Sequence, residues 1–293
     1  MARSASNPIV ERAMKLLITG GGGRLGRWVV EELRSDHEVL VAGLEETPPD
    51  AVWPGVRYEQ ADLTDIDAVA RVADGAEAIV HLAAFPSPIG REPEDVFANN
   101  MVTTFNIVEA AVRLGARKVI YSSSGSALGF AFRFRDMVPD YMPMDEEHPL
   151  RPQDAYGLSK WLGEEILESA TRRTGIRTIV LRPTNVVVPE DYAERVPRML
   201  ENAGSMPTYV DARDFARAVR AALDDTEIEH DRFFITADDT MSREPLAVAF
   251  PRRFPGSEAV CAGLTGTEGP ISSAKAKRVL GYCPQHSWRT ELT

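Results

Sequence analysis

A tyrosine and a lysine stand four residues apart in the stretch that runs from Tyr156 to Lys160. On a helix this spacing places both side chains on one face, about one turn apart. A lysine ammonium beside a phenol favours the phenolate, so the tyrosine can exchange a proton with a hydroxyl near neutral pH. The spacing therefore predicts an acid–base pair, although a solvated lysine beside a half-buried tyrosine is the alternative.

A glycine-rich segment lies far upstream, at residues 19–26, and reads Thr-Gly-Gly-Gly-Gly-Arg-Leu-Gly. It follows the apolar run 14–18 and precedes the amphipathic run 25–33. A turn between a strand and a helix is the context in which such glycines bind a dinucleotide pyrophosphate. Together with the tyrosine and lysine, it predicts hydride transfer between a nicotinamide and an alcohol or carbonyl.

The composition is ordinary for a globular protein of 293 residues, with 44% hydrophobic and 26% charged residues. A net charge of −11 disfavours nucleic acid and anionic membrane surfaces as partners. No apolar run reaches about 18 residues, so no membrane span is predicted. The expected partner is therefore a small-molecule substrate.

The N-terminal segment and the two cysteines indicate the cellular compartment in which the protein is expected. Residues 1–13 contain no apolar segment, so we interpret them as a disordered leader and not as a secretory signal. Cys261 and Cys283 form no framework of spaced pairs, which favours a reducing, cytoplasmic location. No His/Cys cluster has the spacing of metal ligands, so no metal site is predicted.

Strand-like and helix-like runs alternate through the first two thirds of the chain. Strands are expected at 15–19, 38–42, 56–60, 78–82, 118–122 and 178–181, and helices at 25–33, 65–73, 96–114 and 154–173. This alternation predicts an α/β fold with a doubly wound parallel sheet, that is, a Rossmann fold. Ligands bind beyond the carboxyl ends of such strands, where the glycine-rich turn, the serines at 122–124 and Asn185 all fall.

The pattern loosens after Pro183, where prolines recur and only two more helices are expected, at 210–225 and 272–280. We therefore predict a dinucleotide-binding core over 14–182. Residues 183–293 should form a small C-terminal substrate lobe that is interleaved with this core.

Further motifs occur in the order found in a known family. They are Asp62-Leu63, His81-Leu82-Ala83-Ala84, the helix segment 100–106, Ser123-Ser124 with Gly129, Arg182-Pro183-Thr184-Asn185, 210–214 and 275–284. In these motifs the chain resembles the extended short-chain dehydrogenase/reductase family, the NAD-dependent epimerase/dehydratase group, over nearly its whole length. Its short lobe and its Ser-Ser…Gly-Phe turn are most similar to uronate dehydrogenase-like members.

This resemblance implies roles for individual residues. Tyr156 would be the general acid or base, Ser124 would hold the substrate oxygen near it, and Lys160 would lower the pKa of Tyr156 and bind the nicotinamide ribose. The cofactor-binding residues so implied are Gly20, Gly23, Arg24, Leu25, Gly26, Asp62, Leu63, Leu82, Ala83, Ala84, Asn100, Ser122, Tyr156, Lys160 and Pro183. The candidate substrate-binding residues are Ser124, Phe85, Arg133 and Asn185.

Arg133 is a candidate because the aromatic and partly basic stretch 129–150 lies between Ser124 and Tyr156 and should border the pocket. Arg133 or Arg135 could clamp a substrate carboxylate bidentately, and a surface loop with aromatics packed on the core is the alternative. We interpret the charged cluster 145–148 as a solvated loop, and His81 as a packing residue near the cofactor.

The end of the second strand bears on the cofactor, because the family often places an aspartate there for the adenosine ribose. Gly43 occupies that position, and Glu45 could reach the ribose, which favours NAD. Arg24 and Arg27 could still supply a 2′-phosphate site, so NADP is not excluded.

The segment between Pro183 and Val210 is only about 25 residues long, whereas nucleotide-sugar members carry a longer one there. The favoured function is therefore an NAD(P)-dependent oxidoreductase acting on a small polar alcohol or carbonyl, such as a sugar or uronic acid. A nucleotide-sugar epimerase with tightly bound NAD and a non-catalytic dinucleotide-binding sensor are the alternatives. By family analogy, helices 96–114 and 154–173 would form the interface of a homodimer.

Overall fold

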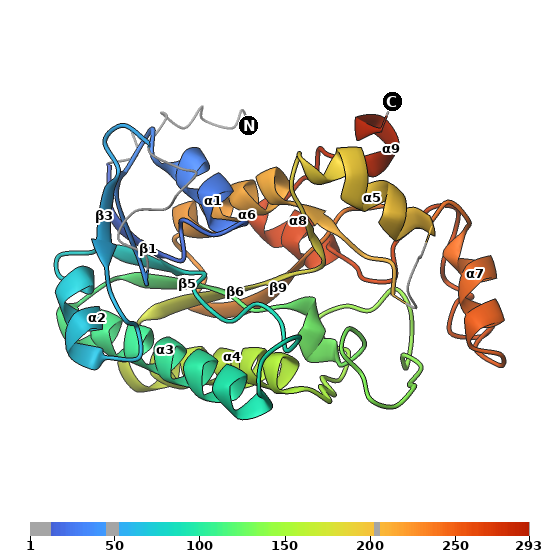
Figure 1. Cartoon of the computed structure of the whole chain (residues 1–293), viewed down its shortest axis with the longest axis horizontal. Helices are drawn as coiled ribbons and strands as arrows, with labels where there is room; N and C mark the ends of the chain where they lie inside the picture. Colours follow the sequence, from blue (N-terminus) through green and yellow to red (C-terminus); the bar gives the residue numbers. More distant parts are fainter. Residues whose placement is uncertain (1–12, 45–52, 202–205, 293) are drawn as a thin grey trace, which may run out of the picture.

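A computed structural model describes residues 13–44, 53–201 and 206–292 of the chain. Its centre is a parallel sheet of seven strands in the order β3-β2-β1-β4-β5-β6-β9 (Figure 1). The strands are β1 (Lys15–Thr19), β2 (Glu38–Gly43), β3 (Arg57–Gln60), β4 (Ala78–His81), β5 (Lys118–Ser122), β6 (Arg177–Pro183) and β9 (His230–Ile235). The Rossmann-type α/β sheet predicted from the sequence is confirmed.

The strand order reverses next to β1, because the chain first builds outward to β3 and then returns to place β4 on the other side of β1. Such a reversal leaves a crevice beyond the carboxyl ends of the two strands, where ligands bind in this kind of sheet. The strand ends that face this edge are Thr19, Gly43, His81 and Ser122.

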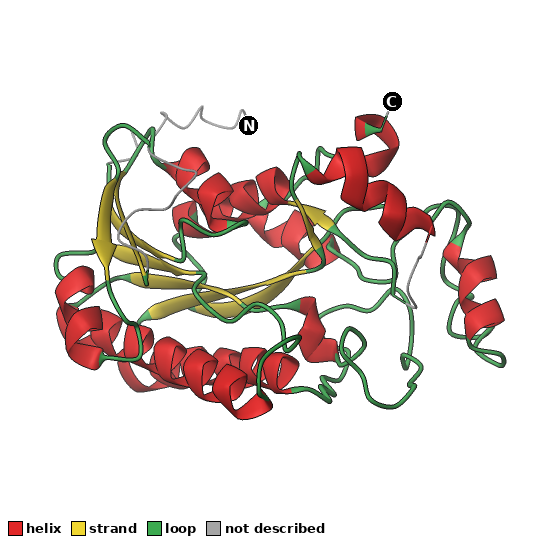
Figure 2. Cartoon of the chain, viewed as in Figure 1, coloured by secondary structure: helices red, strands yellow, loops and turns green. Residues whose placement is uncertain are grey.

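Helices cover both faces of the sheet (Figure 2). One face packs on α1 (Gly26–Leu33), α6 (Ala212–Asp224) and α8 (Ala274–Leu280), and the other on α2 (Ile66–Ala73), α3 (Pro93–Leu114) and α4 (Ala155–Thr174). In β1, Leu16 and Ile18 enter the first core cluster while Leu17 enters the second. This alternation follows from the period of two residues along a strand.

Local signals fix where α4 begins, and therefore where the expected acid–base pair sits. Asp154 caps the helix by accepting a 2.9 Å hydrogen bond from the backbone N–H of Gly157. The helix ends at Thr174, and Gly175 follows as its C-cap with a φ of 76°, which is accessible to glycine at little energetic cost. Tyr156 thus lies in the first turn of α4, with Lys160 one turn further on.

The C-terminal part of the chain contributes to the sheet as well as to a flanking lobe. The strand β9 and the helices α6 and α8 belong to the core layers. The flanking elements are β7 (Val186–Val187), α5 (Asp191–Glu201), β8 (Val210–Asp211), α7 (Leu246–Arg253) and α9 (Trp288–Glu291), with the 3-10 turn η1 (Gly125–Leu128) beside them. The helix expected over 210–225 is in fact β8 followed by α6, because the Asp211 side chain caps α6 at Arg213. Across the described ranges, no helix is both long and apolar enough to cross a membrane.

Candidate active site

Ser124, Tyr156 and Lys160 come together at the carboxyl end of β5. The Lys160 ammonium lies 5.9 Å from the ring centroid of Tyr156 and donates a 2.8 Å hydrogen bond to the carbonyl oxygen of Ser122. The Ser124 side chain forms a hydrogen bond with that of Tyr156. All three residues are less than a tenth exposed. The arrangement can therefore move a proton between a buried phenol and a substrate oxygen held by the serine.

Burial is the main electrostatic influence on both titratable groups. It raises the pKa of Tyr156, which the hydrogen bond from Ser124 opposes and the charge of Asp154 reinforces. Burial lowers the pKa of Lys160 to about 7, against the opposing charge of Glu164. In this structure burial outweighs the other influences, so the pKa of Tyr156 lies above its ordinary value, and the lowering of that pKa by Lys160 stays a prediction.

The glycine-rich turn between β1 and α1 is packed too closely at two positions to admit a side chain. Gly20 has a φ of 69°, and a Cβ on it would lie 2.8 Å from the backbone nitrogen of Ala83. A Cβ on Gly26 would collide with the carbonyl oxygen of Gly20. The turn thus presents bare backbone at the helix N-terminus, which suits the close approach of a phosphate.

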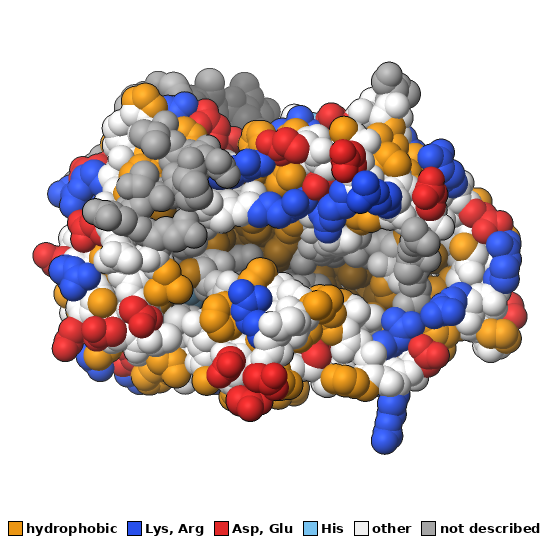
Figure 3. Space-filling model, in the orientation of Figure 1, with side chains coloured by type: hydrophobic (Ala, Val, Ile, Leu, Met, Phe, Trp, Pro, Cys, Tyr) orange, Lys and Arg blue, Asp and Glu red, His pale blue; other side chains and the backbone are white. Residues whose placement is uncertain are grey.

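A pocket of about 270 Å³ opens beside this turn. In the space-filling view a hollow with hydrophobic side chains on its floor crosses the molecule, and basic side chains gather along its upper rim (Figure 3). The residues that line the pocket are Gly20, Gly22, Gly23, Val41, Ala42, Gly43, Leu44, Tyr58, Ala61, Asp62, Leu63, Ala83, Ala84, Phe85, Asn99 and Thr103. Seven of them, Gly20, Gly23, Asp62, Leu63, Ala83, Ala84 and Phe85, were expected at the site.

Sequence reasoning missed Tyr58, Asn99 and Thr103 as lining residues. Tyr58 lies in β3, shortly before the expected Asp62, so an aromatic residue near that strand end was the available signal. Asn99 and Thr103 lie on α3 on either side of Asn100, and only the helix geometry shows that they face the pocket. Glu45, the candidate ribose ligand, lies outside the described residues, as does most of the expected leader.

Arg24 and Leu25 were expected to line a pyrophosphate. The guanidinium of Arg24 forms an ion pair with the Asp191 carboxylate at the start of α5, and the neighbouring Arg27 pairs with Glu190 at 2.7 Å. Leu25 packs against the first core cluster, as does Leu82. In this conformation Arg24 therefore links the glycine-rich turn to the C-terminal lobe.

Asn100 was expected among the cofactor-binding residues, and in this structure its amide is engaged by other parts of the protein. Its amide oxygen accepts hydrogen bonds from Phe85 N (2.8 Å) and Asn99 Nδ2 (3.1 Å). Its amide nitrogen donates to Phe85 O and to Ser159 Oγ, both at 3.1 Å. An asparagine amide has two donors and two acceptor lone pairs, all of which are used here. Asn100 therefore links Phe85, in the segment after β4, to Ser159 on α4 by hydrogen bonds.

Of the candidate substrate-binding residues, some line the pocket and others are engaged by other parts of the protein. Phe85 lines the pocket, whereas the amide oxygen of Asn185 accepts a 2.8 Å hydrogen bond from Arg195. Arg133 is turned to other partners, since its Nε lies 3.0 Å from Asp136 and its guanidinium lies over the ring of Phe254 at 5.7 Å. A carboxylate clamp by Arg133 therefore has no support in this conformation.

An aromatic neighbour of Tyr156 was missed. The ring of Phe132 lies edge-on to that of Tyr156, with 6.0 Å between the centroids. Pro183 is buried at the end of β6 and packs close to η1, which follows the turn formed by Ser122, Ser123 and Ser124. The stretch 129–150 thus does border the acid–base pair, through Phe132 and not through Arg133.

The cluster 145–148 is not wholly solvated, which corrects the interpretation given above. Glu146 is half-buried and accepts a 2.7 Å hydrogen bond from the backbone N–H of Phe234. His148 is 2% exposed and accepts a 3.0 Å hydrogen bond from the N–H of Asp140. His81 is fully buried between the hydroxyls of Thr19 and Thr104, the packing position expected.

The fold and the Ser-Tyr-Lys site define the short-chain dehydrogenase/reductase class of enzyme. Residues 16–235 match the model of the NAD-dependent epimerase/dehydratase family, and the chain belongs to this family. Its relatives include a uronate dehydrogenase and a UDP-glucose 4-epimerase, so it belongs to a family of enzymes.

Two relatives and one solved structure illustrate the range of enzymes to which the chain is similar. The chain is 30% identical over 226 residues to a uronate dehydrogenase of Pseudomonas syringae pv. tomato, covering 77% of this chain and 75% of that protein. It is 30% identical over 201 residues to a putative UDP-glucose 4-epimerase of Methanocaldococcus jannaschii, covering 67% of this chain and 62% of that one. A UDP-glucose 4-epimerase structure from Thermotoga maritima is 25% identical, with a TM-score of 0.72 over 95% of this chain and 96% of that one.

Proposed function

We propose that the protein is an NAD-dependent dehydrogenase that oxidises a small polar sugar, such as a free sugar or a uronic acid. The observation that carries this proposal is the shortness of the segment between β6 and β8. Its described residues contain only the two-residue strand β7 and the helix α5. A segment of this size leaves little protein to cradle a nucleoside diphosphate, so a small substrate is favoured over a nucleotide sugar.

The residues present fit NAD, because glycines of this turn line the pocket with backbone alone, and side chains at Gly20 and Gly26 would collide with neighbouring backbone. Gly20 and Gly23 would lie against the pyrophosphate, Asp62 and Leu63 beside the adenine, and Ala83 beside the inner ribose. When bound, NAD supplies the acceptor for the hydride that leaves the carbinol carbon. NADP is the second candidate, with Arg24 and Arg27 as the candidate residues for its 2′-phosphate.

The protein's own part in the reaction is to hold the substrate oxygen and to move its proton. Ser124 would hold the hydroxyl, and the Tyr156 phenolate would take the hydroxyl proton as the carbonyl forms. In the reverse direction the Tyr156 phenol would return that proton to the alcohol oxygen. Since burial raises the pKa of Tyr156, the phenol predominates at neutral pH, and sugar oxidation should become faster as the pH rises.

The second candidate is a nucleotide-sugar epimerase that keeps its NAD bound. The putative UDP-glucose 4-epimerase of M. jannaschii favours it, since it matches this chain at the same 30% identity as the uronate dehydrogenase does. A non-catalytic dinucleotide sensor is the third candidate. It is disfavoured because Ser124, Tyr156 and Lys160 are all retained and lie together.

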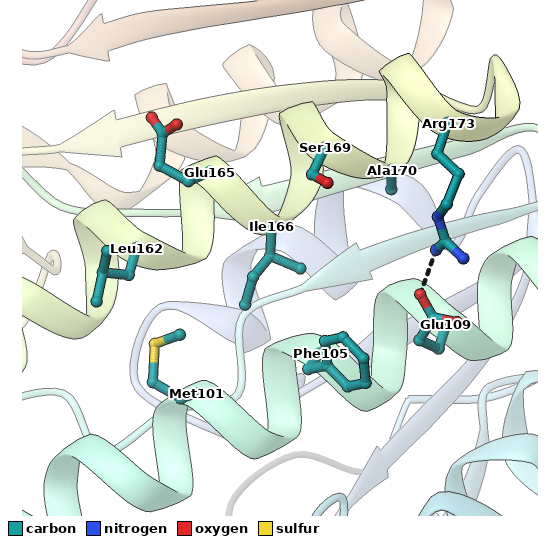
Figure 4. A pocket seen from close by; sticks show the side chains of 9 residues that line it. All are labelled: Met101, Phe105, Glu109, Leu162, Glu165, Ile166, Ser169, Ala170 and Arg173. Carbon is teal, nitrogen blue, oxygen red and sulfur yellow. Dashed lines mark hydrogen bonds and ion pairs between the residues drawn. The ribbon is translucent and has the colours of Figure 1, made fainter.

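The face formed by α3 and α4 would be the interface of a homodimer. A shallow groove runs between these helices, lined by Met101 and Phe105 on α3 and by Leu162 and Ile166 on α4 (Figure 4). Phe105 is 52% exposed, although it is a large apolar side chain. Covering such a groove with a second copy would remove its apolar surface from water.

The function is tested by absorbance at the reduced-nicotinamide band, with NAD or NADP and a panel of free sugars, uronic acids and nucleotide sugars. Turnover of a small sugar is expected, with a fall of at least about 100-fold in Tyr156→Phe, the lower end of the effect of a general acid–base group. No turnover across the panel, combined with NAD that copurifies with the protein and with epimerisation of a nucleotide sugar, would instead establish the second candidate.

A further inference from the structure

A buried ion pair lies beneath the acid–base site. Arg182 on β6 donates to both carboxylate oxygens of Glu164 on α4, with Nε–Oε1 at 2.9 Å and Nη2–Oε2 at 2.6 Å. The two side chains are 2% and 0% exposed. Replacing such a pair by apolar residues is often neutral or stabilising, so a buried ion pair is weak evidence for a purely stabilising role.

The same carboxylate also reaches the serine turn that carries the site. Ser123 donates a 2.5 Å hydrogen bond from its hydroxyl to Glu164 Oε1. Ser123 stands between Ser122, whose carbonyl oxygen holds the Lys160 ammonium, and Ser124, which is bonded to Tyr156. A shift of Glu164 would therefore move both contacts of the turn.

We propose that Glu164 is a positioning residue of the active site, whose buried carboxylate fixes the turn of Ser122, Ser123 and Ser124 through Ser123 and favours the charged form of Lys160. The inference rests on the proposed function, because Lys160 matters to the reaction only if Tyr156 exchanges a proton there. Glu164 itself touches neither substrate nor cofactor, and it acts through Ser123 and Lys160.

The groups around Lys160 explain why one carboxylate has this effect. On α4 itself Tyr156 precedes it, and on the sheet it faces His81 of β4 and Tyr121 of β5, whose ring centroid is 4.9 Å from Nζ. These neighbours are neutral at pH 7, since burial lowers the pKa of His81 to about 3 and raises those of the two tyrosines.

Two cations lie behind the carboxylate. They are Arg182 of β6 and Arg232 of β9, the latter with its Nε 3.4 Å from Glu164 Oε2. Burial lowers the pKa of Lys160 to about 7, and the charge of Glu164 is the influence that opposes this fall. Without the carboxylate, Lys160 would be left among neutral groups and two guanidiniums, so its charged form would be disfavoured.

The charge of Lys160 can be measured directly on the free protein. The chain has five lysines, so the ¹³Cε resonances of labelled lysine can be followed through a pH titration and assigned with Lys160→Met. We expect a wild-type midpoint for Lys160 at a pH of about 7. In Glu164→Gln it should fall by at least about 1 pH unit, the lower end of the effect of a neighbouring charge. The matched control is Glu165→Gln on the exposed side of α4, which should leave the midpoint unchanged.

Glu164→Gln leaves the buried Arg182 without its partner and could prevent folding. The double variant Glu164→Gln/Arg182→Gln removes both charges, and its Lys160 midpoint should still lie below that of the wild type because Arg232 remains. An unchanged midpoint in either folded variant would overturn the proposal, and so would a wild-type midpoint below a pH of about 6. Since the titration needs neither cofactor nor substrate, absence of turnover contradicts the proposed function and leaves this result standing.

Discussion

Arg24 on the glycine-rich turn pairs with Asp191, 167 residues further along the chain, and so ties the cofactor side of the molecule to the C-terminal lobe. Asp191 Oδ2 also accepts hydrogen bonds from Arg195 Nη1 at 2.9 Å and from the backbone N–H of Val188 at 3.0 Å. We expect Asp191→Asn to lower the free energy of unfolding by about 1–3 kcal/mol, because it strips charge from a nearly buried acceptor. Urea denaturation measures this change.

The matched control is Glu190→Gln, which breaks the neighbouring pair with Arg27. Its carboxylate is 62% exposed, and exposed pairs contribute about 0–1 kcal/mol. Equal losses in the two variants would show that burial of Asp191 has no special effect.

Gly26→Ala tests the packing of the glycine-rich turn. Its methyl group would collide with the carbonyl oxygen of Gly20, so the turn must move, and overpacking of this kind costs about 1–3 kcal/mol. We expect NAD affinity, measured by calorimetric titration, to fall at least about tenfold, which corresponds to about 1.4 kcal/mol. The control is Gly125→Ala, where the nearest atom is 3.5 Å from the added carbon. Undiminished affinity in Gly26→Ala would place the cofactor away from this turn.

His81 should make the protein sensitive to acid. Burial lowers its pKa to about 3, whereas the unfolded chain takes up this proton near pH 6.5. Between these values only the unfolded state carries the proton, so the contribution of His81 to stability is lost as the pH falls. The stability advantage of the wild type over His81→Gln should shrink by about 1.4 kcal/mol per pH unit below pH 6. Urea denaturation at pH 7.5, 5.5 and 4.5 measures it, and a constant difference would contradict a neutral buried imidazole.

Phe105→Glu tests the proposed dimer face. A charge placed in the groove between α3 and α4 would have to lose its water if a second copy covered it. Light scattering after size-exclusion chromatography should therefore show a dimer for the wild type and a monomer for the variant. Val248→Glu on α7 changes another exposed apolar side chain, 51% exposed, and should leave the dimer intact. A monomeric wild type would contradict the proposal.

Elements with strong local patterns could be predicted from the sequence. The bounds of β1 and β5 agree with the expected 15–19 and 118–122. The helix α4 differs by one residue at each end, and α3 begins three residues earlier than expected and ends where expected. The helices α5 and α7 were missed because Pro197 and Pro251, which normally interrupt helices, lie inside them. The strand β9 was missed because it begins His-Asp-Arg, and its place in the sheet comes from pairing with β6.

In the candidate site, too, residues in short motifs could be predicted, and contacts between distant segments could not. Ser124, Tyr156 and Lys160 could be predicted because each lies in a short motif whose spacing carries the signal. The partners of Asn100, Arg24 and Arg133 could not, since they come from segments distant in the sequence or from loop conformation. A side chain's availability for a ligand depends on those partners, which composition and spacing do not reveal.

Lys118 lies at the amino end of β5, on the side of the sheet away from the candidate active site. Its buried ammonium donates to the carbonyl oxygens of Ala222 (2.7 Å), Leu223 (2.9 Å) and Asp225 at the end of α6. Ser122 lies at the other end of the same five-residue strand, where the substrate would be held. A change in the turns at the carboxyl ends of the strands would therefore leave the hydrogen bonds between Lys118 and α6 in place.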